Sequence, residues 1–527
     1  MVRAIEELQQ KSRLEIIAFS CLFLMVLFSP HSIAASQTAW LIGMFFLLAR
    51  FLVKPKLYLQ RTPLDLPLLA FFLWSVVSSV FSYTPLISID KLRSVAIFLV
   101  FYFVIALVKS SKTSLILCFV LIASCMINVL YVPVERIIGR GVEIHGLKPE
   151  SPLAKALLMD GDTLLKANDK VLKTPEELVE EISKNEKTTI FFYRPDFYYS
   201  VQVNREDLLE GESAKEKLGI QSWKKSHNWR STGFFGHWTT YADVLQLIAS
   251  LTFGFLVIFA ERLPVFSKNS SNFTNFDLKA IATLLICFLL MAFALILSGT
   301  RAPQAGLAFS ALLIVLLSRN KKMIFALMSV LIPAIIVVSI YLHESRKIGF
   351  IDPNDDSTKY RQTVYREALQ LWVQSPRHII FGIGMDSVRV YAKEWRLFDD
   401  GKLPLGHFHS TPIQILVERG LPALLIWLWI IWAYTKLLLK AIRKKAGLEK
   451  GALLGIFGGF VGFILSGLVH YNLGDQEVAM IFFLLMGLAF VLQETSAASS
   501  QTSTFASGKK SLIKSLIFRS SPSETAT

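Results

Sequence analysis

Four side chains that combine positive charge with proton-transfer chemistry stand next to apolar segments of the sequence. Arg230 lies in HNWRSTGFFGHWTTYADVL and Arg301 in LILSGTRAPQAG, while His407 and His409 lie in LPLGHFHSTPIQILVERG. Guanidinium groups pair bidentately with phosphate oxygens and stay charged. A neutral imidazole can accept a proton from an attacking hydroxyl group near physiological pH. These residue types therefore suit transfer of a group from a diphosphate to a hydroxyl acceptor.

Each of these residues also has an ordinary structural explanation. Arg301 could snorkel to a membrane interface, Arg230 could be a surface arginine, and a histidine in an external loop is often only polar surface. His407 and His409 could instead bind a metal ion, but two ligands without a third nearby are weak evidence for one. Their rings would lie on one side only in an extended segment, because residues two apart diverge on a helix.

The composition indicates a membrane protein with many spans. Of the 527 residues, 53% are hydrophobic and 18% are charged, against about a quarter charged in soluble proteins. This excludes a disordered protein and a disulfide scaffold. The net charge of +15 is typical of basic cytoplasmic loops rather than of nucleic-acid binding. All four cysteines lie in apolar runs without a Cys/His cluster, so neither structural zinc nor a disulfide is implied.

Apolar runs long enough to cross a bilayer, which takes about 20 residues, recur along the chain. The first run could also pass for a signal peptide, but we expect it to be an anchor. We predict spans at 14–30, 33–53, 64–83, 92–108, 114–131, 241–260, 280–298, 303–318, 323–342, 420–438, 452–470 and 476–492.

The short basic loops between these spans fall on one side, as the positive-inside rule requires of cytoplasmic loops. Both termini are then cytoplasmic, and the long segments 132–240 and 343–419 are external. The polar residues that could do chemistry lie in these segments or at span ends that face the same way. They are Arg230, His237, Arg301, Arg361, His407, His409, His470 and Asp475.

The predicted fold class is an all-α polytopic membrane protein of about twelve transmembrane helices, with a small α+β insert and a helical periplasmic loop. We expect five helices in 1–131, the insert at 139–205, four helices in 220–342, a large periplasmic loop at 343–419, three helices in 420–495 and a disordered tail at 496–527.

The insert alternates short β-type runs with TPEELVEEISK, an amphipathic helix for which Thr174 and Glu177 predict a capping box. GVEIHGLKPESPLAKALLMDGDTLLKANDKVLKTPEELVEEI resembles a bacterial PDZ domain, a family that binds extended peptides at a sheet edge. IIGRGV is the only candidate for that family's carboxylate-binding loop, so a structural role for the insert is an equal alternative. Asp160-Gly161-Asp162 mimics a glycosyltransferase metal site, but we expect a turn before a strand.

Four stretches in order resemble the superfamily of O-antigen ligases and O-antigen polymerases. They are RSTGFFGHWTTYADVLQLIA, LILSGTRAPQAGLAFSALLIVLLS, RQTVYREALQLWVQSPRHIIFGIGMDSV and HFHSTPIQILVERGLPALLI. The resemblance covers roughly residues 220–495. It implies transfer of a glycan from an undecaprenyl-diphosphate carrier to a hydroxyl acceptor, such as lipid A core, on the periplasmic face and without a metal or other cofactor.

The resemblance also assigns roles to residues. Arg230 and Arg301 match the arginines that hold the diphosphate, and His409 matches the histidine that activates the acceptor, with His407 beside it. Ser410 stands where the family has asparagine. Arg361 fits a stretch of the same loop, with Tyr365 at its aromatic position. For His237, His470 and Asp475 we expect substrate binding from the same external cavity.

Rival functions remain open. A polymerase of the same superfamily would use the same donor and differ in its acceptor. A transporter of polysaccharide or lipid would fit the span count, but no internal repeat is visible and few charges lie in the spans. A zinc-type intramembrane protease is rejected, because His343-Glu344 is followed by Lys347 where the second histidine should be. Expected partners are the lipid-linked donor, the acceptor, membrane lipids and a peptide or protein for the insert, with no nucleic acid.

Overall fold

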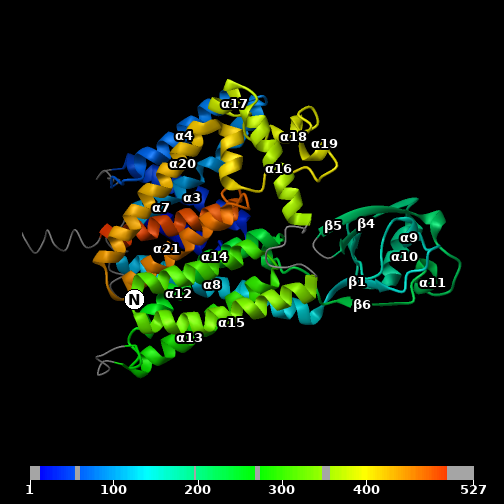
Figure 1. The fold of residues 1–527 in the computed structure, drawn as a ribbon, viewed down its shortest axis with the longest axis horizontal. Helices are drawn as coiled ribbons and strands as arrows, with labels where there is room; N and C mark the ends of the chain where they lie inside the picture. The colour runs from blue at the N-terminus through cyan, green and yellow to red at the C-terminus, as the bar shows by residue number, and fades with distance from the viewer. Residues whose placement is uncertain (1–11, 54–59, 195–196, 267–272, 347–355, 495–527) are drawn as a thin grey trace, which may run out of the picture.

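The chain folds into a bundle of apolar helices with a small sheet domain at one end (Figure 1). The computed structural model describes residues 12–53, 60–194, 197–266, 273–346 and 356–494. The expected tail at 496–527 lies outside the described residues. The insert and helices α18 and α19 lie toward the same end of the bundle in Figure 1.

The N-terminal part contains both long and short apolar helices. Each of α2 and α4 has 16 residues, which makes it about 24 Å long, less than the roughly 30 Å of a bilayer core. The predicted span 92–108 is helical but interrupted by a 3₁₀ turn. The elements are α2 (Arg13–Phe28), α3 (Ile33–Leu52), α4 (Asp65–Val80), α5 (Pro85–Asp90), α6 (Leu92–Val95), η1 (Ala96–Phe98), α7 (Leu99–Leu107) and α8 (Ser111–Ile138).

The remaining predicted spans also fall on helices. They are α12 (Trp238–Ala260), α13 (Asn275–Leu297), α14 (Arg301–Ser318), α15 (Lys321–Arg346), α20 (Thr411–Lys444), α21 (Gly447–Gly467) and the last helix, Gln476–Glu494. Within the described residues, eight helices are long and apolar enough to cross a membrane: α3, α8, α12, α13, α14, α20, α21 and the last helix. The chain is therefore a multi-pass membrane protein.

Helix α12 lies buried at the centre of the bundle. It packs closely on α21, and small residues on the two helices allow this close approach. A Cβ atom at Gly455 would lie 2.6 Å from the Leu251 Cα, and a Cβ atom at Gly254 would meet the backbone of Gly451 and Gly455. Glycines that let helix backbones touch are typical of packing within a membrane, where dispersion contacts replace the hydrophobic effect.

Helix α20 is broken at Gly420, and this break determines where its first turns lie. Gly420 has φ +78°, a left-handed conformation that favours glycine, and Pro422 follows two residues later. A Cβ atom at Gly420 would collide with the Ile380 carbonyl of α17. The segment from Thr411 to Arg419 therefore turns away from the rest of α20 and packs beside α17 and α16.

Within its described residues, the long segment between α15 and α20 contains four helices. These are α16 (Asp356–Val373), α17 (Pro376–Phe381), α18 (Val388–Tyr391) and α19 (Leu397–Asp400). Helices α16, α18 and α19 contribute to a small apolar core that includes Val364, Phe398 and Phe408. The core anchors the segment that carries His407 and His409, because Phe408 between them is only 1% exposed.

The insert is an antiparallel sheet with strand order β5-β4-β2-β1-β6, and β3 pairs with β2. It extends beyond the expected 139–205, because β6 pairs with β1. Its elements are β1 (Arg140–His145), α9 (Pro152–Lys155), β2 (Thr163–Ala167), β3 (Lys170–Val171), α10 (Pro175–Lys184), β4 (Lys187–Arg194), β5 (Phe197–Asn204), η2 (Arg205–Asp207), α11 (Ala214–Leu218) and β6 (Ser222–Ser226), followed before α12 by η3 (Gly233–Phe235).

Two local predictions for the insert have different outcomes. The turn before a strand at Asp160-Gly161-Asp162 is confirmed, since β2 begins at the next residue and Asp162 forms an ion pair with Arg194 at 2.7 Å. Thr174 is the N-cap of α10, as expected, but the capping box is wrong. The Thr174 hydroxyl makes no capping hydrogen bond, and the Glu177 side chain accepts from the Lys173 N–H at 2.6 Å rather than from the Thr174 N–H.

The packing of α12 on α21 gives a test of the bundle. We expect Gly455→Leu to destabilise the protein by about 3 kcal/mol, because the new side chain would displace backbone atoms of α12. The measurement is the melting temperature of the detergent-purified chain. The control is Leu465→Ala on the same helix, whose side chain is partly exposed on the bundle surface. Equal melting temperatures for Gly455→Leu and wild type would contradict this packing.

Candidate active site

Arg230 is fixed in the segment between the insert and α12. Its Nε donates to the Ser298 carbonyl at 2.9 Å, and its Nη2 donates to the Gly299 carbonyl at 3.2 Å and the Thr300 hydroxyl at 3.0 Å. Among the described residues it forms no ion pair with a carboxylate, and Nη1 has no hydrogen-bond partner. The turn that precedes α14 therefore orients Arg230 but leaves one face of its guanidinium available.

Two more arginines lie close to Arg230. Arg301 is the first residue of α14, directly after Thr300, and Arg361 lies on α16, where it donates to the Ser357 hydroxyl at 2.6 Å and the Val469 carbonyl at 3.3 Å. Burial first, and then the charges of Arg301 and Arg361, lower the pKa of Arg230 to about 10. Three guanidinium groups this close repel one another, and a bound anion would relieve the repulsion.

The loop histidines lie near Arg361, whose charge acts on His409. The rings of His407 and His409 are 4.2 Å apart, and the His409 N–H donates to the His407 Nδ1 at 3.1 Å. Tyr365 on α16 donates to the His409 carbonyl at 2.9 Å. His409 has φ +46°, an uncommon conformation for a residue with a side chain, and such strain is often found at functional sites.

Both loop histidines are neutral at physiological pH. Burial, and then the charges of His470 and His237, lower the pKa of His407 to about 4. The His407 side chain lines a cavity, but the surrounding protein limits its contact with water, and this lowers its pKa. Burial, His407 and Arg361 lower the pKa of His409 further, to about 2. A neutral imidazole has one free nitrogen that can accept a proton.

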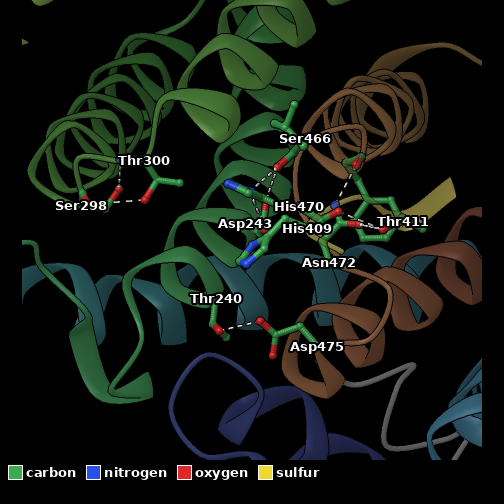
Figure 2. A network of polar contacts seen from close by, with 12 residues as sticks. Thr240, Asp243, Ser298, Thr300, His409, Thr411, Ser466, His470, Asn472 and Asp475 are labelled. Carbon is green, nitrogen blue, oxygen red and sulfur yellow. Dashed lines mark hydrogen bonds and ion pairs between the residues drawn. The ribbon is translucent and has the colours of Figure 1, made fainter. Parts of the chain in front are cut away.

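The buried carboxylate of Asp243 lies beside His470, a further histidine of the site (Figure 2). Asp243 of α12 is 1% exposed and accepts from the Ser466 hydroxyl at 2.5 Å. Its second oxygen lies 3.7 Å from the His470 Nδ1. The His470 carbonyl accepts from the Thr411 N–H at 3.0 Å. This network ties α12, α21 and α20 together beside His409.

Asp475 and His237 are two further polar residues of this site. The Thr240 hydroxyl donates to Asp475 at 2.5 Å (Figure 2). Burial first, and then a hydrogen bond with Glu477, raise the pKa of Asp475 well above its usual range. Burial and Arg230 lower the pKa of His237, which precedes α12. All eight residues singled out from the sequence thus gather around one end of the bundle.

A cavity of about 520 Å³ is lined by three of these residues, His237, His407 and Asp475, and by further charged side chains. Arg230, Arg301 and Arg361 are not among its lining residues. Aromatic and aliphatic side chains of α4, η1, α20, α21 and the last helix line the rest of it. These apolar residues include Phe71, Phe98, Trp427, Ile430, Phe460, Phe463 and Phe482. Such a cavity suits a molecule with a polar head and an apolar chain.

The sequence reasoning missed two charged residues of this cavity. Glu418 and Arg419 are each 4% exposed, just before the break in α20. Glu418 accepts from the Asp386 N–H at 2.8 Å, and Arg419 donates to the Tyr471 hydroxyl at 3.2 Å. An ionisable pair next to an apolar run was the available signal.

Comparison with known proteins agrees with this picture. Residues 286–428 match the family model described as O-antigen ligase. The matched segment includes Arg301, Arg361, His407 and His409. It does not reach Arg230 or the insert, whose likeness to a PDZ domain stays a prediction. No curated protein matches the chain. Over residues 286–428 the chain is therefore similar to the O-antigen ligase family, and its apolar helices are those of a multi-pass membrane protein.

Proposed function

We propose that this protein transfers a glycan from an undecaprenyl-diphosphate carrier to a hydroxyl acceptor, such as lipid A core, at the periplasmic face of the inner membrane. The observation that carries the proposal is the group of three arginines near the site histidines, at the end of the bundle where a partly apolar cavity lies. The family uses lipid-linked glycan and acceptor substrates in general, and this geometry suits both.

The arginines would stabilise the leaving group. As the bond between the sugar C1 and the phosphate oxygen breaks, negative charge grows on the diphosphate. Arg230, Arg301 and Arg361 already repel one another, so this charge is stabilised without rearrangement. The positive N-terminal end of α14 at Arg301 adds to the effect. Because the carrier diphosphate is an activated leaving group, no nucleotide is needed.

His409 would act as the general base. The acceptor oxygen forms the new bond to C1, its proton passes to the free nitrogen of His409, and undecaprenyl diphosphate leaves. The low pKa of His409 keeps it neutral and able to accept the proton, although it also makes the imidazole a weak base. His407 would hold His409 in place, because the His407 Nδ1 accepts a hydrogen bond from the His409 backbone N–H.

The remaining predicted residues would bind substrate. His237 and Asp475, which line the cavity, with His470 beside them, can hydrogen-bond sugar hydroxyl groups. The apolar body of the cavity would hold part of the isoprenoid chain. The insert would contact a peptide or protein if it works as PDZ domains do.

Polymerisation of carrier-linked glycans is the second candidate, because it needs the same donor site and differs only in the acceptor. A transporter would need access to the substrate from both faces. All the polar candidates of this chain gather at one end of the bundle instead, which favours an enzyme.

The first test uses cells that lack this protein, complemented with wild type, Arg230→Ala, Arg301→Ala or His409→Ala. Since His409 supplies general base catalysis, His409→Ala should lower transfer about 100-fold or more, and both arginine variants should leave glycan on the carrier. Surface glycans and carrier-linked glycans are measured on gels, with membrane levels checked.

The glycan pattern separates the candidates. Full-length glycan that stays on the carrier indicates transfer to a final acceptor, whereas only short glycans on the acceptor indicate polymerisation. Normal glycans in all three variants, present at wild-type levels, would contradict the enzyme and favour a transporter.

The histidine pKa values predict the pH dependence of transfer. A histidine base works when neutral, and burial lowers the pKa of His407 from 6.5 to about 4 and that of His409 further. Lowering the pH from 7.5 to 5.5 should therefore change kcat/KM by less than about twofold. The measurement is release of undecaprenyl diphosphate from proteoliposomes. A decline centred near pH 6.5 would contradict this environment for the base.

A further inference from the structure

The hairpin formed by β4 and β5 packs directly on the segment that carries Arg230. Tyr193 and Tyr198 are paired across the two strands, so their side chains lie on the same face of the sheet. The Tyr193 hydroxyl accepts from the Arg230 N–H at 3.4 Å. Tyr193 is 5% exposed. The insert therefore contacts the candidate active site rather than projecting freely from the bundle.

Trp238 joins this hairpin to the Arg230 guanidinium. The Tyr198 ring stacks on the Trp238 ring at 5.5 Å with an interplanar angle of 21°. The Arg230 guanidinium carbon lies 4.4 Å from the centre of the same indole ring. Stacking of this kind is a recognised attraction between arginine and tryptophan. Tyr198, Trp238 and Arg230 thus form a continuous stack.

Arg140, at the start of β1, holds the stack from the insert side. It donates to the Tyr198 hydroxyl at 3.1 Å, and its guanidinium carbon lies 4.4 Å from the centre of the Trp229 ring. Trp229 directly precedes Arg230 and is 2% exposed. Both neighbours of the Arg230 side chain, Trp229 and Trp238, are therefore packed against residues of the insert.

We propose that the insert completes the diphosphate site, with Tyr198 as a positioning residue that holds Arg230 through Trp238. This inference rests on the proposed function, because it assumes that Arg230 binds the diphosphate. An arginine side chain loses rotamer freedom when it is fixed. Tyr198 and Trp238 would fix the Arg230 side chain before the substrate arrives, so that substrate binding does not have to order it.

The structure offers matched variants to test this role. Tyr198→Leu removes the aromatic ring from the stack, whereas Tyr198→Phe keeps the ring and loses only the hydrogen bond from Arg140. Tyr199→Leu is the control, because Tyr199 stands next along the strand, points to the opposite face, is 42% exposed and stacks on Phe192.

Binding of farnesyl diphosphate, a short prenyl diphosphate, to the full detergent-purified chain is measured by titration calorimetry. Tyr198→Leu should weaken binding about tenfold, Tyr198→Phe should bind within about threefold of wild type, and Tyr199→Leu should bind as wild type does. Arg230→Ala should weaken binding at least as much as Tyr198→Leu. Melting temperatures verify that all variants are folded.

The results that would contradict the diphosphate site differ from those that would contradict the positioning role of Tyr198. Wild-type binding by Arg230→Ala would overturn the proposed diphosphate site itself. Weak binding by Arg230→Ala with wild-type binding by Tyr198→Leu would overturn only the positioning role. Equal losses in Tyr198→Leu and Tyr199→Leu, or in Tyr198→Leu and Tyr198→Phe, would also overturn it, because the effect would then not depend on the aromatic stack.

Discussion

Repulsion among three guanidinium groups at one end of an apolar bundle is the constraint on which the rest of this structure depends. Arg230, Arg301 and Arg361 reach this site from three separate elements, and Arg230 and Arg361 are held by hydrogen bonds to neighbouring carbonyl and hydroxyl groups. The charges of Arg301 and Arg361 act on Arg230, and an anion is attracted to such a group of arginines. A diphosphate with an apolar chain suits this site, since its charge complements the arginines and its chain complements the apolar lining of the cavity.

The histidine side of the site has a different physical basis. Surrounding protein and neighbouring histidines lower the pKa of His407 and His409, and the charge of Arg361 adds to this effect at His409. The left-handed backbone of His409 is kept by the buried Phe408 and by the hydrogen bond from Tyr365. A proton acceptor is thus fixed at the site that also holds a leaving group, which is the arrangement that transfer to a hydroxyl requires.

Apolar run length predicted where the helices lie, because each span must cover the bilayer core, but it did not predict that α2 and α4 are shorter than that core or that 92–108 is interrupted. Stretches that resemble the O-antigen ligases and polymerases identified Arg230, Arg301 and His409 as candidate site residues. The nearness of Arg230 to Arg301 could not be predicted, since it depends on how α12 and α13 return the chain to the turn at Gly299. Docking of the insert through Tyr198 and Trp238 could not be predicted either, because local patterns carry no information about such distant contacts. Glu418 and Arg419 were missed because they flank a span and resemble ordinary end charges.

The most direct test of the account is a structure of the protein with undecaprenyl diphosphate, determined by electron cryomicroscopy. The account predicts phosphate oxygens about 3 Å from the Arg230 Nη1 and near Arg301 and Arg361, with the isoprenoid chain entering the cavity between α20 and the last helix. A diphosphate bound elsewhere, with these three arginines turned away from it, would contradict the central claim.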